Sequence, residues 1–175
     1  MRAFVSVDVP PWGRRGLEGD PAPPHFTLLF LEALEESRAG PLAERIAEHV
    51  ATAAPFSLAF GEVGAFPDAE RPRVVFLSVR EGARELSALA ASVRTAADAV
   101  GVAYDTRPFV PHFTLFRVRG AADRARAARR LGHAMPEGPA AFVVERLRLK
   151  ESQLTRSGAV HRVVATMPLA GVPPS

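Results

Sequence analysis

Residues 24–28 of this chain read Pro-His-Phe-Thr-Leu, and residues 111–115 repeat the same five residues in the same order. Both copies lie in short apolar stretches that predict β-strands, and side chains two positions apart on a strand point to the same face. Each copy therefore presents a histidine beside a threonine on one face and turns its phenylalanine and leucine toward the core. The repeat predicts two strands that carry the same pair of polar side chains.

The polar pairs are His25 with Thr27 and His112 with Thr114. Two imidazoles that face each other across a cleft suit general acid–base catalysis, because a neutral ring accepts a proton from water while a protonated ring donates one to a leaving oxygen. A threonine hydroxyl beside each ring can donate a hydrogen bond to a phosphoryl oxygen. His25 and His112 are therefore the candidate catalytic residues.

Two other interpretations of these histidines stay open. Histidine is the commonest metal ligand, but a catalytic zinc site uses three protein ligands, and the sequence has neither cysteine nor an HExxH pattern. We therefore expect no metal and no cofactor. The histidines could also be strand residues with a structural role, an interpretation that the repeated five-residue motif disfavours.

The composition is that of a folded protein without disulfides. The 175 residues contain 47% hydrophobic and 23% charged residues, which predicts a packed core, and residues 1–175 are enough for a single domain. The absence of cysteine fits a cytoplasmic protein. No apolar run approaches the roughly 18 residues of a membrane span, and the N-terminal apolar stretch is too short for a signal peptide. We expect a cytoplasmic protein without a membrane partner.

Positive charge is concentrated in the second part of the chain. Residues 1–70 carry 5 basic and 11 acidic side chains, whereas residues 71–175 carry 17 basic and 8 acidic ones. Arginine accounts for 21 of the 22 basic residues, and its forked guanidinium matches phosphate. The excess, including the arginine-rich segment 124–130, indicates either a polyanionic partner or a solvated basic surface.

Hydrophobic periodicity and turn residues predict an alternation of strands and helices. Pro41 suits the first turn of a helix, and the Pro- and Gly-rich segments 10–24 and 61–71 are expected to be loops. Strands are expected at 2–8, 25–31, 56–60, 73–79, 112–118, 141–150 and 160–168, and helices at 41–53, 82–100 and 121–131. Surface positions are expected for His49, His133 and His161, and loop-anchoring positions for Trp12 and Tyr104.

The chain resembles the two-histidine phosphoesterases, and within them the bacterial and archaeal 2′-5′ RNA ligase, or RNA 2′,3′-cyclic phosphodiesterase, family. The most specific stretch is 107–117, Arg-Pro-Phe-Val-Pro-His-Phe-Thr-Leu-Phe-Arg. The resemblance also covers the opening strand, the first histidine motif, the Phe-Pro loop with the strand after it, and the closing strand and turn, at residues 1–10, 25–31, 66–79 and 147–154.

This resemblance implies an α+β fold made of two pseudo-symmetric lobes, each an antiparallel sheet with outer helices, around a central cleft. It implies hydrolysis of a terminal 2′,3′-cyclic phosphate on RNA to a 2′-phosphate without metal, and for some members reversible joining of 2′-5′ linkages in tRNA halves. Thr27, Thr114 and Arg117 become candidate substrate-binding residues, and we expect a monomer that acts on RNA ends or cyclic nucleotides. An RNA- or nucleotide-binding module with little turnover and a small cyclic nucleotide phosphodiesterase remain alternatives.

Three features depart from the family pattern. The loop 10–24 replaces a helix that the family usually has before the first motif, so one lobe could be trimmed. Leu29 stands where members often carry a basic residue, which would remove a phosphate contact. Arg117 lies five residues after His112 and would face away from it in a regular strand, so it reaches the cleft only if the strand ends or bulges.

Overall fold

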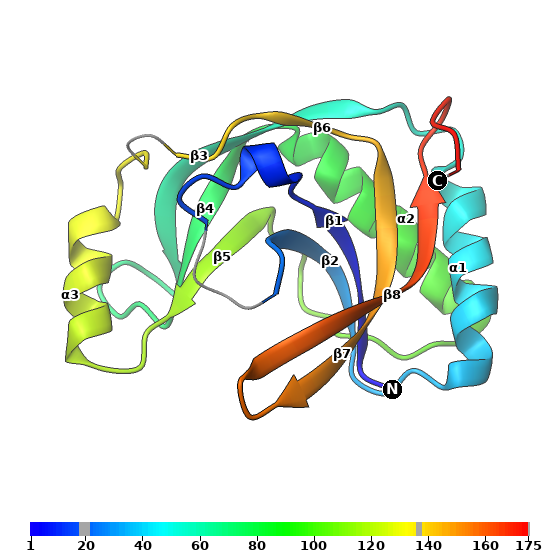
Figure 1. Ribbon diagram of the computed structural model, residues 1–175, viewed down its shortest axis with the longest axis horizontal. Coiled ribbons are helices and arrows are strands. Elements are labelled where there is room, and N and C mark those ends of the chain that lie inside the picture. Colours follow the sequence, from blue (N-terminus) through cyan, green and yellow to red (C-terminus); the bar gives the residue numbers. More distant parts are fainter. Residues whose placement is uncertain (18–21, 136–137, 175) are drawn as a thin grey trace.

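The computed structural model of the protein describes residues 1–17, 22–135 and 138–174. These residues form two four-stranded antiparallel sheets (Figure 1). The first sheet has the order β2 (His25–Leu31), β1 (Ala3–Asp8), β7 (Arg146–Thr155) and β8 (Gly158–Pro168). The second has the order β5 (His112–Arg117), β4 (Val74–Glu81), β3 (Phe56–Phe66) and β6 (Phe142–Val144).

The two sheets repeat one arrangement around the two histidine motifs. Each motif strand, β2 or β5, lies at the edge of its sheet and pairs antiparallel with the strand next to it, β1 or β4. The predicted α+β class with two lobes, each an antiparallel sheet with helices outside it, is confirmed. The edge position matters because each motif strand is then free on one side to face the other lobe.

Three α-helices and one short 3-10 helix complete the described structure. Helices α1 (Glu36–Val50) and α2 (Ala83–Val100) pack together behind and beside the sheets, whereas α3 (Ala121–Arg130) lies at the opposite end of the molecule from α1 (Figure 1). The 3-10 helix η1 (Pro11–Gly13) follows β1. None of the described helices is long and apolar enough to cross a membrane.

The lobes meet through the phenylalanines of the two motifs. Phe26 and Phe113 are 1% and 6% exposed, and their ring centroids lie 5.6 Å apart in an edge-to-face contact. Phe60 of β3 packs against both rings, at 5.5 Å from Phe26 and 6.0 Å from Phe113. Edge-to-face aromatic pairs at these separations add to the free energy gained from apolar burial. The cluster holds the motif strands side by side in the core between the sheets.

Some boundaries differ from the sequence prediction. The helix expected at 41–53 runs from Glu36 to Val50 and contains Pro41 in its interior. Proline there removes one backbone hydrogen bond. The buried face extends on both sides of it through Ala39, Leu42 and Ile46, and this packing outweighs the missing bond.

The strands also differ in length from the expected ones. β3 continues to Phe66 through a segment expected to be a loop, because Val63 to Phe66 pair with β4 although this run contains Gly64. The strand expected at 141–150 is divided at Glu145 into β6 and β7, which belong to different sheets. β8 begins at Gly158, so β7 and β8 form a long hairpin whose polar tip gives no clear strand pattern.

Replacing Phe26 with alanine should lower the free energy of unfolding by about 3–5 kcal/mol, the usual cost of emptying a buried aromatic site. Val160 on β8 is 53% exposed, so Val160→Ala should cost no more than about 1 kcal/mol. Chemical denaturation of the two variants measures both values. A loss below about 1 kcal/mol for Phe26→Ala would show that the contact between the lobes is not essential to the fold.

Candidate active site

One cavity of about 660 Å³ is lined by both histidine motifs. His25 and Thr27 reach it from β2, and His112 and Thr114 reach it from β5. The two histidines are half-buried and the two threonines are exposed, while the phenylalanine between each pair is buried. The structure therefore brings the four polar side chains of the sequence prediction to one surface, with the alternation expected for strands.

Each histidine is held by the same local hydrogen bond. The Nδ1 atom of His25 lies 2.9 Å from the carbonyl oxygen of Pro23, and the Nδ1 atom of His112 lies 2.6 Å from that of Val110. Because a carbonyl oxygen only accepts, Nδ1 must carry the hydrogen in both rings. Nε2 is therefore the ring nitrogen that this bond leaves available in each histidine, and the two rings are alike in this respect.

Phenylalanine rings from neighbouring strands support both imidazoles. Phe4 of β1 stacks on His25 at 4.9 Å, and Phe66 and Phe76 contact His112 edge-on at 5.0 and 5.6 Å. Phe76 can lie there because Gly64 has no side chain: a Cβ atom at Gly64 would fall 2.7 Å from the Phe76 ring. The rings limit the rotation of each imidazole.

A β-bulge brings Arg117 to the cavity. The pairing of β5 with β4 skips Leu115, because Thr114 and Phe116 pair with adjacent residues of β4. The extra residue shifts the alternation of side chains by one position. Arg117 therefore lines the cavity together with His112, as the sequence analysis required for its role.

The first motif carries an irregularity at the same place. The pairing of β2 with β1 skips Leu28, so the next residue, Leu29, is 2% exposed and lies in the core. A basic residue at this position would not face the cavity here. The cavity-facing residue is Phe30, and the guanidinium of Arg2 lies 4.7 Å from its ring centroid. Arg2, which sequence analysis missed, places a positive charge on this side of the cavity.

The expected surface position of His161 is wrong. Its ring lines the cavity from β8, 5.2 Å from the ring of His25 and 4.7 Å from that of Phe4. The pairing of β1 with β7, and of β7 with β8, carries it there, and this order of strands leaves no local signal in the sequence. His49 and His133 are exposed and do not line the cavity, as expected.

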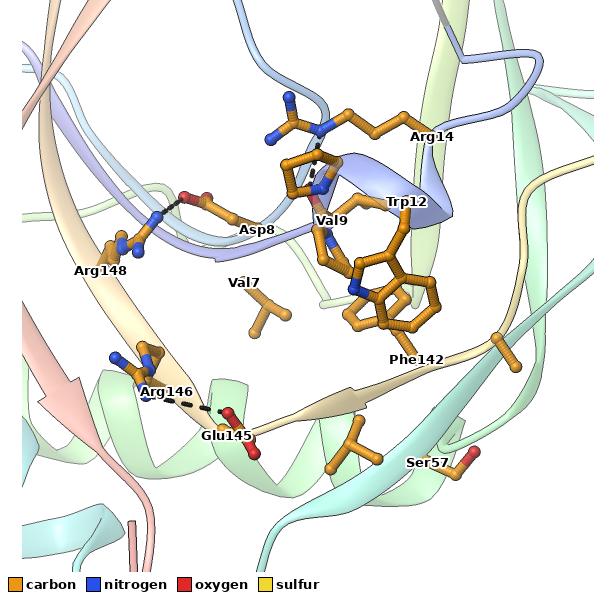
Figure 2. Close-up of a pocket in the computed structure, with 14 residues that line it drawn as sticks. Val7, Asp8, Val9, Trp12, Arg14, Ser57, Phe142, Glu145, Arg146 and Arg148 are labelled. Carbon is orange, nitrogen blue, oxygen red and sulfur yellow. Dashed lines mark hydrogen bonds and ion pairs between the residues drawn. The ribbon is translucent and has the colours of Figure 1, made fainter. Parts of the chain in front are cut away.

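The 10–24 segment contributes to two cavities rather than one. Its residues around Gly16 and Pro23 line the histidine cavity, while Pro10 to Trp12 and Arg14 line a second cavity of about 650 Å³ (Figure 2). Trp12 is 66% exposed there, so the prediction that it anchors a loop is wrong. The same prediction is confirmed for Tyr104, which packs on the core with Arg94 near its ring.

A partly buried ion pair lies between the second cavity and the first motif. Asp8, which pairs with His25 across β1 and β2, accepts hydrogen bonds from Lys150, Arg148 and Ser6 (Figure 2 shows the bond from Arg148). Burial raises the pKa of the Asp8 carboxyl, but these hydrogen bonds and the Lys150 charge outweigh it, so the pKa lies below its ordinary value. Burial lowers the pKa of Lys150, and its bond to Asp8 offsets that only in part.

No group of three or more histidine, aspartate or glutamate side chains that could hold a metal ion is found within residues 1–17, 22–135 and 138–174. The chain contains no cysteine at all. Metal independence itself stays a prediction.

The sequence model of the 2′-5′ RNA ligase superfamily matches residues 17–155, a span that includes both histidine motifs. The chain belongs to the 2′-5′ RNA ligase superfamily. The superfamily assignment confirms the resemblance seen in the sequence. The match extends over residues 17–155 and so does not depend on the two short motifs alone.

Individual relatives agree with the superfamily. A protein of Aeropyrum pernix named RNA 2′,3′-cyclic phosphodiesterase is 31% identical over 140 residues, which cover 80% of this chain and 78% of that protein. A protein of Archaeoglobus fulgidus with the same name is 34% identical and covers 93% of this chain and 97% of its own length. A Thermus thermophilus crystal structure superposes with a TM-score of 0.73 at 27% identity, covering 98% of this chain and 99% of that one.

The Asp8 ion pair should make stability depend on pH. Because the folded-state pKa of Asp8 is lowered, its stabilisation is present above the unfolded-state pKa of about 3.9 and is lost as the pH falls through the lower folded value. Unfolding by urea should therefore show a larger loss of free energy between pH 5 and pH 2 for the wild type than for Asp8→Asn. An equal loss in both proteins would contradict this account.

At pH 7 the same variant should be less stable than the wild type by about 3–5 kcal/mol, because Lys150, which is 4% exposed, loses its carboxylate partner. Adding Lys150→Met should restore part of that loss, since the buried charge is then removed as well. A double variant as unstable as the sum of the two single ones would show that the two residues act independently.

Proposed function

We propose that this protein is a phosphodiesterase that hydrolyses the 2′,3′-cyclic phosphate at RNA ends to a 2′-phosphate. The observation that carries the proposal is the pair of histidine–threonine strands at one cavity, with both rings held through Nδ1. The names of the Aeropyrum and Archaeoglobus relatives support it. His25 and His112 are the proposed catalytic residues, and Thr27, Thr114 and Arg117 the proposed substrate-binding residues.

In the proposed reaction one histidine begins neutral and the other protonated. The neutral Nε2 takes a proton from a water molecule as the water oxygen forms a bond to phosphorus. The bond from phosphorus to the ribose O3′ breaks, and the protonated Nε2 of the other ring donates its proton to that oxygen. The phosphate stays on O2′, and each ring ends in the state in which the other began.

The threonines and Arg117 act on the charge of the phosphate. A threonine hydroxyl donates a hydrogen bond to a nonbridging oxygen, whose negative charge rises as the fifth bond to phosphorus forms. Arg117, brought to the cavity by the bulge, offers a forked pair of N–H donors to the same group. These donors are placed before the reaction, so they stabilise the transition state without rearrangement.

The same site can serve the reaction for which the superfamily is named. If a ribose 5′-hydroxyl replaces water as the attacking group, loss of O3′ leaves a 2′-5′ phosphodiester, and the reverse path cleaves it. We propose this as a second activity, including on halves of tRNA. We further propose that residues 1–175 act as one domain, as a monomer and in the cytoplasm, without metal or cofactor.

Replacing either His25 or His112 with alanine should lower kcat by roughly 10²- to 10⁴-fold, the usual contribution of a positioned acid or base. The double variant should lose much less than the product of the two effects, because the pair acts as a unit. Thr27→Ala and Thr114→Ala should each lose roughly 10- to 10²-fold, since each removes one hydrogen bond to a charged oxygen.

Turnover of 2′,3′-cyclic AMP and of a short RNA with a cyclic phosphate end measures these losses. His49→Ala is the matched control, because His49 is exposed on α1 and does not line the cavity. Near-normal turnover by either histidine variant would refute the proposed roles. A protein that binds these molecules but does not turn them over would be the binding module considered in the sequence analysis.

Activity should persist after dialysis against a chelator, because the proposed reaction uses only side-chain protons and hydrogen bonds. The measurement is the rate of cyclic phosphate hydrolysis before and after treatment with EDTA, with each divalent cation then added back. Loss of activity with EDTA and its recovery with one particular cation would replace the proposal by a metal-dependent mechanism.

A further inference from the structure

The histidine cavity extends from β5 onto one face of helix α3. Arg126 and Arg130, which lie four residues apart and so on the same side of the helix, both line it. Arg119, in the turn before α3, lines it as well. Arg124 and Arg129 belong to the same helix but do not line the cavity. The arginine-rich segment 124–130 is thus divided between a cavity-facing pair and an outward-facing pair.

The charged residues near Arg119, Arg126 and Arg130 determine how much of their positive charge is balanced. Asp123 is the acidic residue of the cavity lining, and its Oδ2 accepts a hydrogen bond from the backbone N–H of Arg119 at 2.8 Å. Among the residues that the structure describes, none forms an ion pair with Arg119, Arg126 or Arg130. Burial, together with the charges of Arg126 and Arg129, lowers the pKa of Arg130. Within the described residues, no ion pair therefore balances the positive charge of these three arginines, and Asp123 is the acidic residue that lines the same cavity.

The arginine wall, formed by Arg119, Arg126 and Arg130, adjoins the second histidine motif. The guanidinium of Arg126 lies 4.2 Å from the ring centroid of Phe116, a residue of β5 between Thr114 and Arg117. A cation over an aromatic face is attracted to it, so the contact fixes Arg126 against the motif strand. An RNA strand that extends from the histidines along β5 would pass Arg117 and then Arg119, Arg126 and Arg130.

We propose that Arg119, Arg126 and Arg130 form a subsite that binds the internucleotide phosphates of an RNA chain whose cyclic end lies at the histidines. The proposal rests on the proposed function. Guanidinium groups bind phosphate oxygens through two parallel hydrogen bonds, and a row of them suits a row of phosphates. The subsite makes the preferred substrate an oligonucleotide rather than a cyclic mononucleotide, which is too small to reach the wall and the histidines together.

The test compares two double variants with the same loss of charge on the same helix. Arg126→Gln/Arg130→Gln removes the cavity-facing pair, and Arg124→Gln/Arg129→Gln, the matched control, removes the outward-facing pair. The substrates are a five-nucleotide RNA with a 2′,3′-cyclic phosphate end and 2′,3′-cyclic AMP. Thermal unfolding of each variant verifies that α3 is intact.

In the cavity-facing variant, kcat/KM for the RNA should fall by roughly 10- to 10²-fold, mostly because KM rises. The fall in kcat/KM for 2′,3′-cyclic AMP should be smaller by a factor of at least about ten. Its binding of RNA should also depend less on salt, by about one unit in the slope of log K against log salt. The control should change neither. Equal losses in both variants, or no selective loss on the RNA, would overturn the subsite.

Binding of the same RNA ending in a 2′-phosphate, measured by fluorescence anisotropy, separates this proposal from the proposed function. If the wild type hydrolyses neither substrate, the proposed function fails, yet weaker RNA binding by the cavity-facing variant alone still supports the subsite. If the wild type hydrolyses both substrates but all variants bind RNA equally, the subsite fails and the proposed function stands.

Discussion

The contact between Phe26 and Phe113 is the constraint on which the site depends. Both rings are the middle residue of a His-Phe-Thr sequence, and alternation along a strand means that burying the phenylalanine turns the histidine and threonine outward. Because the two rings pack against each other at 5.6 Å, the two outward faces must border one cavity. The free energy that joins the lobes and the geometry that pairs the histidines therefore come from the same residues.

The two halves of the site are alike in backbone and different in surroundings. Each motif has an Nδ1 bond to the carbonyl two residues earlier and a skipped leucine after the threonine. Beyond the bulge the halves diverge, since the cavity receives Arg117 in one and Phe30, with Arg2 over its ring, in the other. His161 adds a third imidazole next to His25 only. The duplicated backbone places two imidazoles in equivalent local settings, and the unequal neighbours make the two sides of the cavity different.

Local pattern was enough to predict the motif strands and the face that His and Thr share on each of them, because the period of a strand and the spacing of His and Thr are properties of adjacent residues. The α+β class with two lobes was predicted from the resemblance to the two-histidine phosphoesterases. Local pattern was not enough for features that arise from pairing between distant strands. The sequence analysis stated only that Arg117 could reach the cavity if the strand ended or bulged, and it could not predict the bulge itself. It also interpreted Leu29 as the loss of a phosphate contact, but Leu29 is buried, so a basic residue there would not face the cavity. His161 was placed at the surface because nothing near it in sequence indicates that β7 and β8 lie next to β1. Pro41 led to a helix start that is too late in the sequence prediction. A proline is expected at the first turn of a helix, but burial of Ala39 and its neighbours keeps the helix intact on both sides of Pro41.

The excess of arginine in the second part of the chain gains a specific meaning only in three dimensions. From composition, a basic helix is equally well explained as a solvated surface and as a contact for a polyanion. The ten residues of α3 divide between two settings, since some of its arginines border the histidine cavity and others do not. Arg124 and Arg129 lie away from the cavity, whereas Arg126 and Arg130 border it without acidic partners among the described residues. Such unneutralised charge costs free energy in a folded protein through mutual repulsion, and a bound polyanion relieves that cost. The arrangement is thus better suited to an occupied cavity than to an empty one, and the occupant that best matches its row of guanidinium groups is a chain of phosphates.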